Sequence, residues 1–315
     1  MSKVRIEVID NRNWWLKNRW LVLRRSTQIS VLALFLLGPL AGIWIIKGNL
    51  NSSLTLDFLP LTDPFVLLQS WLANHQFGSQ AAIGALIVAA FYFLIGGRAY
   101  CGWVCPVNIV TDTANWARNR LGLRGNTKLH RNTRYWLLGA SLVLSAATGY
   151  VAWEWINPVS VLHRGIIFGM GSGWFIILAV FLFDLAVSKR GWCSHLCPMG
   201  AFYSLLGSHS TIRIRADNRD ACDKCMDCFD VCPEPLVISP ALFGKKDGIG
   251  PVINEINCTN CGRCIDVCSK EVFHFGTRFN NKESSLTVLH PPEKSGDGNL
   301  TRLNPEQFEH EEATT

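Results

Sequence analysis

Eight of the twelve cysteines in this 315-residue chain fall into two runs with the same spacing, C-x2-C-x2-C-x3-C. The first run, "CDKCMDCFDVCP", begins at Cys222, and the second, "CTNCGRCIDVCS", begins at Cys258. A two-residue spacing lets one tight loop present three sulfur atoms to a single face of a metal cluster. Whatever else the chain does, its fold must therefore bring these two loops together around metal.

In this spacing, three thiolates of one run hold one [4Fe-4S] cluster and the fourth holds the other cluster. Zinc is the alternative metal, but zinc sites usually pair two Cys-x2-Cys knuckles across a spacer. The predicted ligands are Cys222, Cys225, Cys228 and Cys268 for cluster one, and Cys258, Cys261, Cys264 and Cys232 for cluster two.

Four short segments around these runs, "TIRIRAD", "PLVIS", "PVINEI" and "EVFHFG", are predicted as strands, and "PALFGKKDGIG" as a surface loop. We therefore predict a small α+β bacterial-type 2[4Fe-4S] ferredoxin module over residues 211–280. The segment 281–315 has few apolar residues and is predicted to be disordered.

Upstream of the module, four windows without a charged residue are long enough to cross a hydrocarbon core of ~30 Å, which takes about 20 helical residues. They cover 26–46, 77–97, 135–153 and 165–183, in a chain that is 49% hydrophobic. Several tryptophans lie near the ends of the windows, where indole rings favour the membrane interface. The sequence therefore predicts an α-helical membrane protein with four transmembrane helices, followed by the ferredoxin module.

Lysine and arginine are distributed unevenly over the loops. Seven precede the first window and seven lie between the second and third windows, whereas the opposite side has only Lys47 and Arg164. This asymmetry predicts a multi-pass protein of the bacterial inner membrane with both termini in the cytoplasm. All twelve cysteines then lie on the reducing side or at its membrane boundary, where metal or redox chemistry is expected rather than disulfides.

The membrane part is predicted to be a tandem two-helix repeat. Each half has a span, a short external helix opened by an N-cap and a proline (Asp63 or Asn157), a second span, and a Cys-x3-Cys-Pro motif. Two halves of equal orientation would be related by an axis along the membrane normal. The motifs place Cys101 and Cys105 in "RAYCGWVCP" and Cys193 and Cys197 in "KRGWCSHLCP".

The predicted organisation has seven parts. These are a cytoplasmic basic N-terminus (1–25), membrane half one with two spans and an external loop (26–97), a cytoplasmic loop with the first Cys-x3-Cys-Pro motif (98–134), membrane half two (135–187), the segment with the second motif (188–210), the ferredoxin module (211–280) and the tail (281–315).

Taken together, the four spans, the two Cys-x3-Cys-Pro motifs and the double-cluster module resemble the NapH-type subunit of periplasmic nitrate reductase systems, over about residues 15 to 280. Proteins with a similar core serve nitrous-oxide respiration, methylamine oxidation and copper-oxidase assembly. The resemblance implies a ferredoxin-type membrane quinol dehydrogenase subunit with quinol as substrate. It also implies a periplasmic iron-sulfur partner and multihaem or nitrate reductase components as electron acceptors.

The four thiols of the Cys-x3-Cys-Pro motifs have three interpretations. Cys105 and Cys197 each precede a proline that opens a helix, so both are predicted at N-cap positions, which favour a thiolate. In the first interpretation the pseudo-two-fold axis brings all four thiols to one additional cluster or metal at the cytoplasmic membrane edge. In the second, each pair is a dithiol switch or a partner contact, and in the third the cysteines are packing residues.

Quinol oxidation releases two protons, so a proton acceptor is expected near a redox centre. Asp184, in "FLFDLAV", is an acid flanked by apolar residues at the cytoplasmic end of the fourth window. The alternative for Asp184 is an ion pair with Lys189, Arg190 or an arginine of the middle loop. His163 and Glu154 are candidates on the external side, and His195 lies inside the second motif.

Two functional classes follow from these motifs. The first is an electron-transfer subunit that oxidises quinol, and the second is an iron-sulfur membrane protein for assembly, reduction or maintenance of another respiratory metalloenzyme. The sequence contains no Cys-x2-Cys-His haem attachment motif and no Gly-rich nucleotide fingerprint, which argues against NADH as the electron donor.

Overall fold

The structure, a computed structural model, describes residues 13–74, 78–123, 129–169 and 171–279. The predicted tail over 281–315 and the first twelve residues of the basic N-terminus lie outside these ranges. Two hydrophobic cores organise the described residues, one among the apolar helices and one in the cysteine-rich module.

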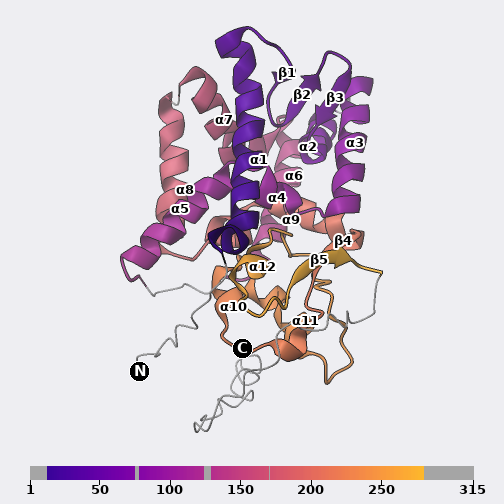
Figure 1. The fold of residues 1–315 in the computed structure, drawn as a ribbon. Helices are drawn as coiled ribbons and strands as arrows, with labels where there is room; N and C mark the ends of the chain where they lie inside the picture. Colours follow the sequence, from indigo (N-terminus) through magenta and orange to yellow (C-terminus); the bar gives the residue numbers. More distant parts are fainter. Residues whose placement is uncertain (1–12, 75–77, 124–128, 170, 280–315) are drawn as a thin grey trace, which may run out of the picture. The chain divides into compact units, whose positions relative to one another are not determined.

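The described residues up to 210 form helices and a small sheet (Figure 1). The helices are α1 (Trp14–Ala41), α2 (Pro64–Asn74), α3 (Ser79–Ile95), α4 (Ala99–Trp103), α5 (Val107–Arg120), α6 (Thr133–Thr148), α7 (Pro158–Phe168), α8 (Trp174–Ala186) and α9 (Pro198–Leu206). Short 3-10 turns cover Ala152–Trp155, Gly171–Gly173 and Gly207–His209, and a π-helical turn covers Trp192–Leu196.

Among the described residues, α1 is the one helix that is long and apolar enough by itself to cross a membrane. At 1.5 Å per residue, α3 with 17 residues, α6 with 16 and α8 with 13 span about 25, 24 and 20 Å. These three helices nevertheless expose large apolar side chains, among them Leu86, Trp136 and Phe175, at 70%, 79% and 75% of their surface. Apolar surface of this extent is typical of a face that contacts lipid or another protein.

The fourth predicted window is not one helix. It is interrupted between α7 and α8, where Gly169 and Gly171 have φ values of 87° and 47°. A glycine adopts such a left-handed conformation without a steric penalty, so Gly169 follows the end of α7 and Gly171 lies in the turn that precedes α8. The apolar composition was recognised, but the glycine run was overlooked as a helix break.

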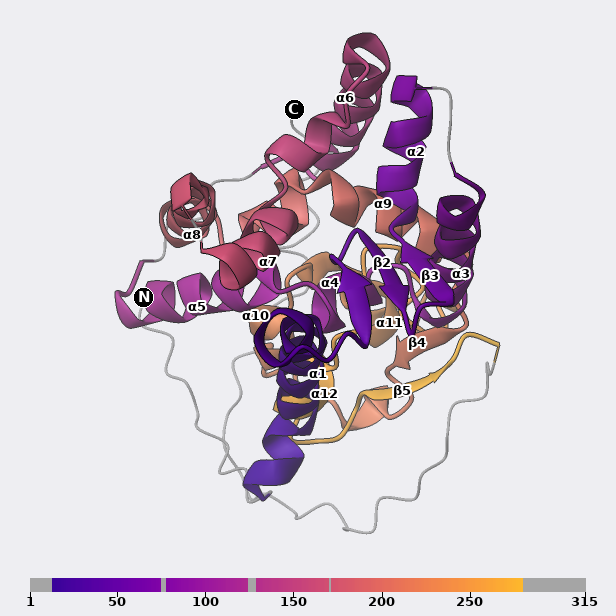
Figure 2. The same ribbon diagram turned by 90° about the horizontal axis from the view of Figure 1, so that it is seen from above.

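A three-stranded antiparallel sheet connects α1 to α2. Its strands are β1 (Ile46–Gly48), β2 (Ser52–Thr55) and β3 (Leu59–Thr62), with Ile46 opposite Thr55 and Ser52 opposite Thr62. The β1–β2 turn is closed by Asn49, whose side-chain oxygen accepts hydrogen bonds from two following backbone N–H groups. Seen from above in Figure 2, the sheet lies between α1 and α3.

Both external helices begin as the repeat predicts. The N–H of Phe65 donates to Asp63 Oδ1 at 2.7 Å at the start of α2, and the N–H of Val159 donates to Asn157 Oδ1 at 3.1 Å at the start of α7. Each cap is followed directly by a proline at the first helical position. The two N-cap predictions are therefore confirmed.

The cysteine-rich module pairs two antiparallel strands and surrounds them with short helices. Ile212 lies opposite Thr277, and Ile214 opposite Phe275. The elements are β4 (Ile212–Arg215), α10 (Asp227–Val231), α11 (Ser239–Phe243), α12 (Arg263–Val267) and β5 (His274–Thr277), with 3-10 turns at Arg219–Ala221 and Pro235–Val237.

Two of the four predicted strands of the module are correct. "TIRIRAD" contains β4, and "EVFHFG" overlaps β5, which runs one residue further, to Thr277. "PLVIS" is instead a 3-10 turn that leads into α11, because Pro235 and Pro240 each start a helical turn. "PVINEI" forms a single bridge, Val252 to Arg215, and the predicted loop "PALFGKKDGIG" begins inside α11.

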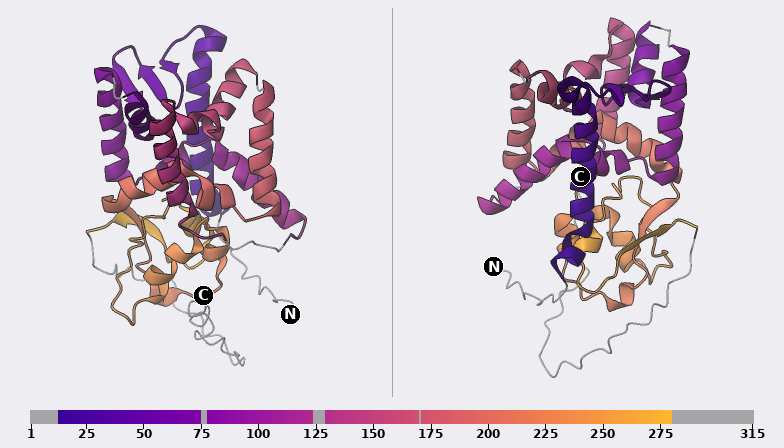
Figure 3. Two further views of the ribbon diagram at one scale, coloured as in Figure 1. Left: turned by 180° about the vertical axis from the view of Figure 1, so that it is seen from behind. Right: turned by 45° about the horizontal axis from the view of Figure 1, so that its top comes forward.

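One end of the apolar helices carries the module, and the opposite end of α1 leads to the β1–β3 sheet (Figure 3). Contacts from α1, α3 and α6 are among those that hold the module. They join the N–H groups of Trp20 and Leu21 in α1 to Asp266, the carbonyl of Ile95 in α3 to Asn260, and the hydroxyl of Tyr135 in α6 to Asn257.

Candidate iron-sulfur and thiol sites

The first site is a cavity with about 360 Å³ of empty volume in the module. Phe229 and Phe273 form an apolar part of its wall, and Asp223, Lys224, Asp227 and Lys270 form a charged part. Cys225, which also lines the cavity, is exposed. The four thiols that line it are those of Cys222, Cys225, Cys228 and Cys268. These are the four cysteines predicted for cluster one.

The second site is a cavity with about 330 Å³ of empty volume between the two-stranded sheet and the loop that precedes α12. Ile214, Ile238 and Ile253 supply an apolar wall, and Arg263 supplies a positive charge. The four thiols that line it are those of Cys232, Cys258, Cys261 and Cys264, the set predicted for cluster two. The fourth cysteine of each run thus lies with the other run's three.

Both cysteine loops use the same backbone device. Lys224 and Met226 in the first run, and Asn260 and Gly262 in the second, have φ values between 47° and 73° at equivalent positions. Left-handed residues tighten the loop so that its sulfurs face one side, and for residues other than glycine they carry strain of about 1–3 kcal/mol. The strain at equivalent positions of both runs is a mark of a functional loop.

The donor set of each cavity fits an iron-sulfur cluster. Among the described residues, no three His, Cys, Asp or Glu side chains converge on the position of a single metal ion, whereas four thiols surround each cavity. Burial raises the pKa of Cys228 to about 12 and that of Cys258 to about 11, so the metal-free thiols are protonated at neutral pH. Binding iron as thiolates would therefore release protons.

The four thiols of the Cys-x3-Cys-Pro motifs lie within electrostatic range of one another. Burial raises the pKa of Cys105, with Cys101 and Cys197 adding to the rise, and burial raises that of Cys193 with a contribution from Cys105. The structure therefore brings the cysteines of both halves together, as the predicted repeat requires. Their role as ligands stays a prediction.

The N-cap prediction for these motifs is correct for Cys197 and wrong for Cys105. Cys197 is the N-cap of α9 and is followed by a proline at the first helical position. Cys105 lies two residues before α5, which begins at Val107. The helix start does not produce a low pKa in either case, because burial raises the pKa of Cys197 to about 12 and also raises that of Cys105.

The first motif contacts the second cavity directly. A Cβ placed on Gly102, between Cys101 and Cys105, would lie 3.3 Å from the Cβ of Cys261, so a larger residue there would push the two loops apart. Trp103 Nε1 donates to the carbonyl of Asn260 at 2.9 Å. The four-thiol site is therefore next to cavity two.

Glu234, two residues after Cys232, is the centre of a buried ion-pair cluster. Its carboxylate lies 3.1 Å from Arg98, 2.7 Å from Arg134 and 3.3 Å from Arg131. Arg98 also donates to the carbonyl of Cys193 at 3.0 Å. The side chains of Arg98 and Arg134 are fully buried, so this cluster ties the module to both Cys-x3-Cys-Pro motifs.

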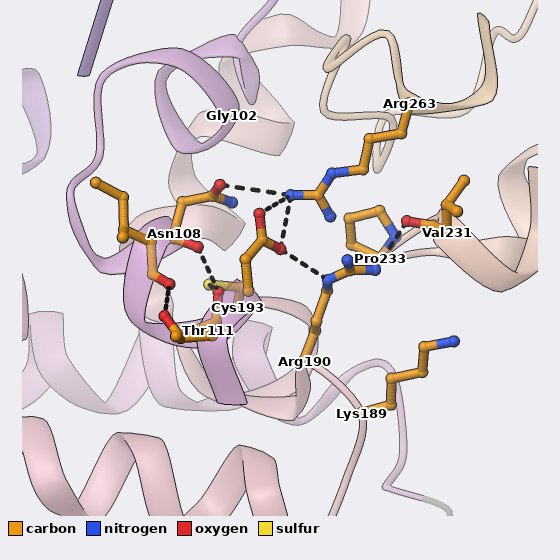
Figure 4. Close-up of polar contacts among 12 residues, drawn as sticks. Gly102, Asn108, Thr111, Lys189, Arg190, Cys193, Val231, Pro233 and Arg263 are labelled. Carbon is orange, nitrogen blue, oxygen red and sulfur yellow. Dashed lines mark hydrogen bonds and ion pairs between the residues drawn. The ribbon is translucent and has the colours of Figure 1, made fainter. Parts of the chain in front are cut away.

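Asp112, on α5, is the centre of a second cluster, in which Arg190 and Arg263 converge on one carboxylate (Figure 4). The distances are 3.1 Å from Arg190 Nε and 2.7 Å from Arg263 Nη2, and Arg25 on α1 also pairs with Asp112. Burial would raise the pKa of Asp112, but the arginines outweigh it and lower the pKa.

Sequence reasoning missed these clusters. The sequence predicts Arg190 as one possible partner of Asp184, whereas the structure pairs Arg190 with Asp112 and Arg98 with Glu234. The position of two charged residues in the sequence could have indicated these clusters. Glu234 directly follows Cys232 and Pro233 at the end of the first ferredoxin run, and Arg263 lies inside the second run.

The proton-acceptor candidates occupy different surroundings. Asp184 is fully buried, and its Oδ1 accepts a hydrogen bond from the N–H of Trp192 at 2.9 Å, while its Oδ2 has no hydrogen-bond partner among the described residues. Arg118 of the middle loop donates to the backbone carbonyl of Asp184 at 3.3 Å. Asp184 thus lies beside the residue that precedes Cys193.

His163 and Glu154 lie elsewhere. His163 is 2% exposed, packs edge-on against Phe35 at 4.8 Å, and has no hydrogen-bond partner for either ring nitrogen among the described residues. Glu154 accepts hydrogen bonds from Asn51 at 2.7 Å and from Asn157 at 3.2 Å. The structure therefore does not bring these two residues together with Asp184. The Nδ1 of His195, in the π-helical turn, is buried without a partner in the described part of the chain.

Two family models match the chain. One, described as a 4Fe-4S binding domain, matches residues 80–124 and 167–215, which contain the two Cys-x3-Cys-Pro motifs. The other, described as a 4Fe-4S dicluster domain, matches residues 221–272, which contain both ferredoxin runs. No solved structure matches the chain.

Curated relatives are similar over most of their length. The methylamine utilization ferredoxin-type protein MauN of Paracoccus denitrificans is 54% identical over 85% of this chain and 93% of its own. The ferredoxin-type protein NapH of Haemophilus influenzae is 48% identical over the same shares, and NapH of Escherichia coli is 47% identical over 89% of this chain and 96% of its own. The chain therefore belongs to the family of ferredoxin-type iron-sulfur proteins that includes NapH and MauN.

Proposed function

We propose that this protein is a membrane quinol dehydrogenase subunit that passes electrons from quinol toward a periplasmic nitrate reductase through partner redox proteins. The observation that carries the proposal is the contact between cavity two and the four-thiol site, at the end of a set of apolar helices. This contact places two predicted redox sites next to each other at the edge of the predicted membrane.

A four-span topology is supported by the ends of the helices. The N-terminal parts of α1 and α6 and the C-terminal parts of α3 and α8 all contact the module or the adjoining α5. A chain whose first and third helices run away from the module and whose second and fourth return would give this arrangement. Both termini and the middle loop would then lie in the cytoplasm, as the distribution of lysine and arginine predicts.

The cysteines of each cavity would hold one cluster. When bound, a [4Fe-4S] cluster supplies a site that accepts and releases single electrons. The chain's own contribution is to exclude water from cavity two with the isoleucines of its wall, and to fix the cavity-two loops against α1, α4 and α5.

The four-thiol site would hold a third cluster or another metal. The match of a 4Fe-4S binding family model to both motifs supports this interpretation over a packing role. The charge balance supports it too, because seven arginines lie near three carboxylates, those of Asp112, Glu234 and Asp266. The arginines are Arg24, Arg25, Arg98, Arg131, Arg134, Arg190 and Arg263. Buried positive charge in such excess requires anions, and thiolate-bound clusters are anions.

Replacing Cys101 and Cys193 together by Ser tests the third site, because the pair removes one thiol from each half. The wild-type chain is expected to hold about twelve irons, four per cluster, and the double variant about eight. The measurement is iron and acid-labile sulfide per chain on anaerobically purified protein, with EPR of the reduced form. Equal iron contents and identical spectra would contradict a cluster at this site.

Asp184 is the proton acceptor that the structure supports best. It is buried, one of its carboxylate oxygens has no partner in the described part of the chain, and it bonds to the backbone next to Cys193. A proton released by quinol beside the four-thiol site could reach this oxygen. His163 and Glu154 do not meet these conditions, since the structure places neither beside the thiols.

The name of the MauN relative supports a second acceptor system. Because MauN and NapH have similar identity to this chain, the name of MauN supports a partner enzyme of methylamine utilization beside the nitrate reductase proposed above. An assembly or maintenance role for such an enzyme is the functional alternative.

The deciding experiment is anaerobic addition of a quinol to the purified protein in proteoliposomes. EPR signals of reduced clusters that appear on quinol addition, and disappear when an oxidised periplasmic partner is added, would support electron transfer. Clusters that stay oxidised with quinol but become reduced with a low-potential donor would favour the assembly role.

A further inference from the structure

We propose that Arg24, on the first apolar helix, holds the reduction potential of cluster two above that of cluster one, so that the membrane half tunes the ferredoxin module. This inference rests on the proposed function, because it requires both clusters to be present. The observations that carry it are the burial of Arg24, its missing hydrogen-bond partners and its place beside cavity two.

Arg24 is a buried cation without a carboxylate of its own. Arg24 is 1% exposed, and its Nε and Nη1 atoms have no hydrogen-bond partner among the described residues. Two acids are in electrostatic range of Arg24. Asp112 already pairs with Arg25, Arg190 and Arg263, and the Asp266 carboxylate accepts hydrogen bonds from the N–H groups of Trp20 and Leu21. An uncompensated buried charge is strongly unfavourable, so this guanidinium requires a further anion.

The position of α1 shows where that anion lies. The Asp266 carboxylate accepts hydrogen bonds from the N–H groups of Trp20 and Leu21, which fixes α1 to α12. The Trp20 ring lies so close to Gly262 that a Cβ there would be 2.7 Å from it. One turn further along α1, Arg24 interacts electrostatically with the thiol of Cys261, which lines cavity two.

Arg263 adds to this field. It lines cavity two, and while its Nη2 pairs with Asp112, its Nη1 has no partner among the described residues. Cys261, whose thiol lines cavity two, is in electrostatic range of both Arg24 and Arg263. The two guanidinium groups therefore stabilise negative charge at this wall of cavity two.

Cavity two is lined by Arg263 and by one acid, Glu234, which is already paired with Arg98, Arg131 and Arg134, whereas cavity one has no such excess of positive charge. Its charged lining residues are two acids, Asp223 and Asp227, and two lysines, Lys224 and Lys270. Its thiol Cys225 is exposed, so water screens these charges. The module thus has two similar cysteine loops in different electrostatic surroundings.

Two effects on the potential of cluster two oppose each other. Burial disfavours the reduced form, which carries one more negative charge, whereas nearby cations favour it. Charges interact more strongly in the low-dielectric interior than at the surface, and Arg24 is both buried and without hydrogen-bonded acids. The inference requires the attraction of the two cations to exceed the penalty of burial, which would favour an electron on the side of the module that faces the four thiols.

The test is an EPR-monitored redox titration of the anaerobically purified full chain with Arg24→Gln. At the potential where half of cluster two is reduced in the wild type, the ratio of reduced to oxidised cluster two should fall about tenfold, which is about 59 mV for a one-electron couple. Cluster one should titrate as in the wild type. Arg24→Lys, which keeps the charge, should restore most of the potential.

Arg19→Gln is the matched control, because it removes the same charge from an exposed position on the same helix. It should leave both potentials unchanged. A Cys225→Ser chain, which perturbs cluster one, identifies which signal belongs to cluster two.

Three results would overturn the inference. The first is an Arg24→Gln protein that keeps its iron and titrates as the wild type, and the second is an equal shift with Arg19→Gln. The third result needs no Arg24 variant. The EPR signal that survives in the Cys225→Ser chain belongs to cluster two, and in the wild type this signal must have the higher reduction potential of the two. A lower potential for that signal would contradict the inference. Wild-type protein without iron would instead contradict the proposed function.

Discussion

Replacing Glu234 by Gln is expected to lower the stability of the folded chain by about 3–5 kcal/mol, the usual effect of removing one partner from a buried ion pair. The change leaves Arg98 and Arg134, both fully buried, without their carboxylate. The measurement is the free energy of denaturant-induced unfolding in detergent, under anaerobic conditions. Glu255→Gln, the same change at an exposed position of the module, is the control and should have little effect.

The same carboxylate predicts a pH dependence. Burial would raise the pKa of Glu234, but Arg98, Arg134 and Arg131 outweigh it and lower the pKa below the ordinary glutamate value of about 4.3. Because the folded-state pKa is lowered, the stabilisation is present above the unfolded-state pKa and is lost as the pH falls through the folded-state pKa. Wild-type protein should lose this part of its stability in acid, and a Glu234→Gln chain that shows the same acid-dependent loss would exclude Glu234 as its source.

Cys232→Ser should remove the cluster of the second run although Cys232 belongs to the first run. The structure places this thiol in cavity two with Cys258, Cys261 and Cys264. We therefore expect a loss of up to about four irons per chain, and loss or alteration of one EPR signal. The affected signal should be the same one that Cys264→Ser affects.

Cys225→Ser is the matched comparison, because Cys225 lies in the same run as Cys232 but lines cavity one. It should affect the other EPR signal. If Cys232→Ser and Cys225→Ser alter the same signal, the ligands are not crossed between the runs, and the grouping of thiols in the two cavities does not describe the clusters.

The sequence was sufficient to predict the module because its information is local. Spacing alone grouped the eight cysteines into the two sets that line the cavities, and β4 and β5 followed from short apolar alternation. The strand prediction for "PLVIS" is wrong because the apolar residues of this segment are also compatible with a helical turn. Pro235 and Pro240 favour the helical turn over the strand.

Long-range contacts could not be predicted in this way. The pairs of Arg98 with Glu234 and of Arg263 with Asp112 join residues more than a hundred positions apart, and a single sequence contains no signal for such partners. Arg24 was counted among the positive charges before the first window, and its missing partners become evident only from burial in the folded chain. The repeat gave a correct expectation for the four thiols, since symmetry brings equivalent loops together.

The central claim is that thiolates of this chain hold iron-sulfur clusters at one end of its apolar helices. Iron and acid-labile sulfide per chain, measured together with EPR on protein purified without oxygen, test that claim most directly. The account predicts at least about eight irons with matching sulfide, and about twelve if the four-thiol site is filled by a cluster. Intact, folded protein that contains neither iron nor labile sulfide under these conditions would contradict it.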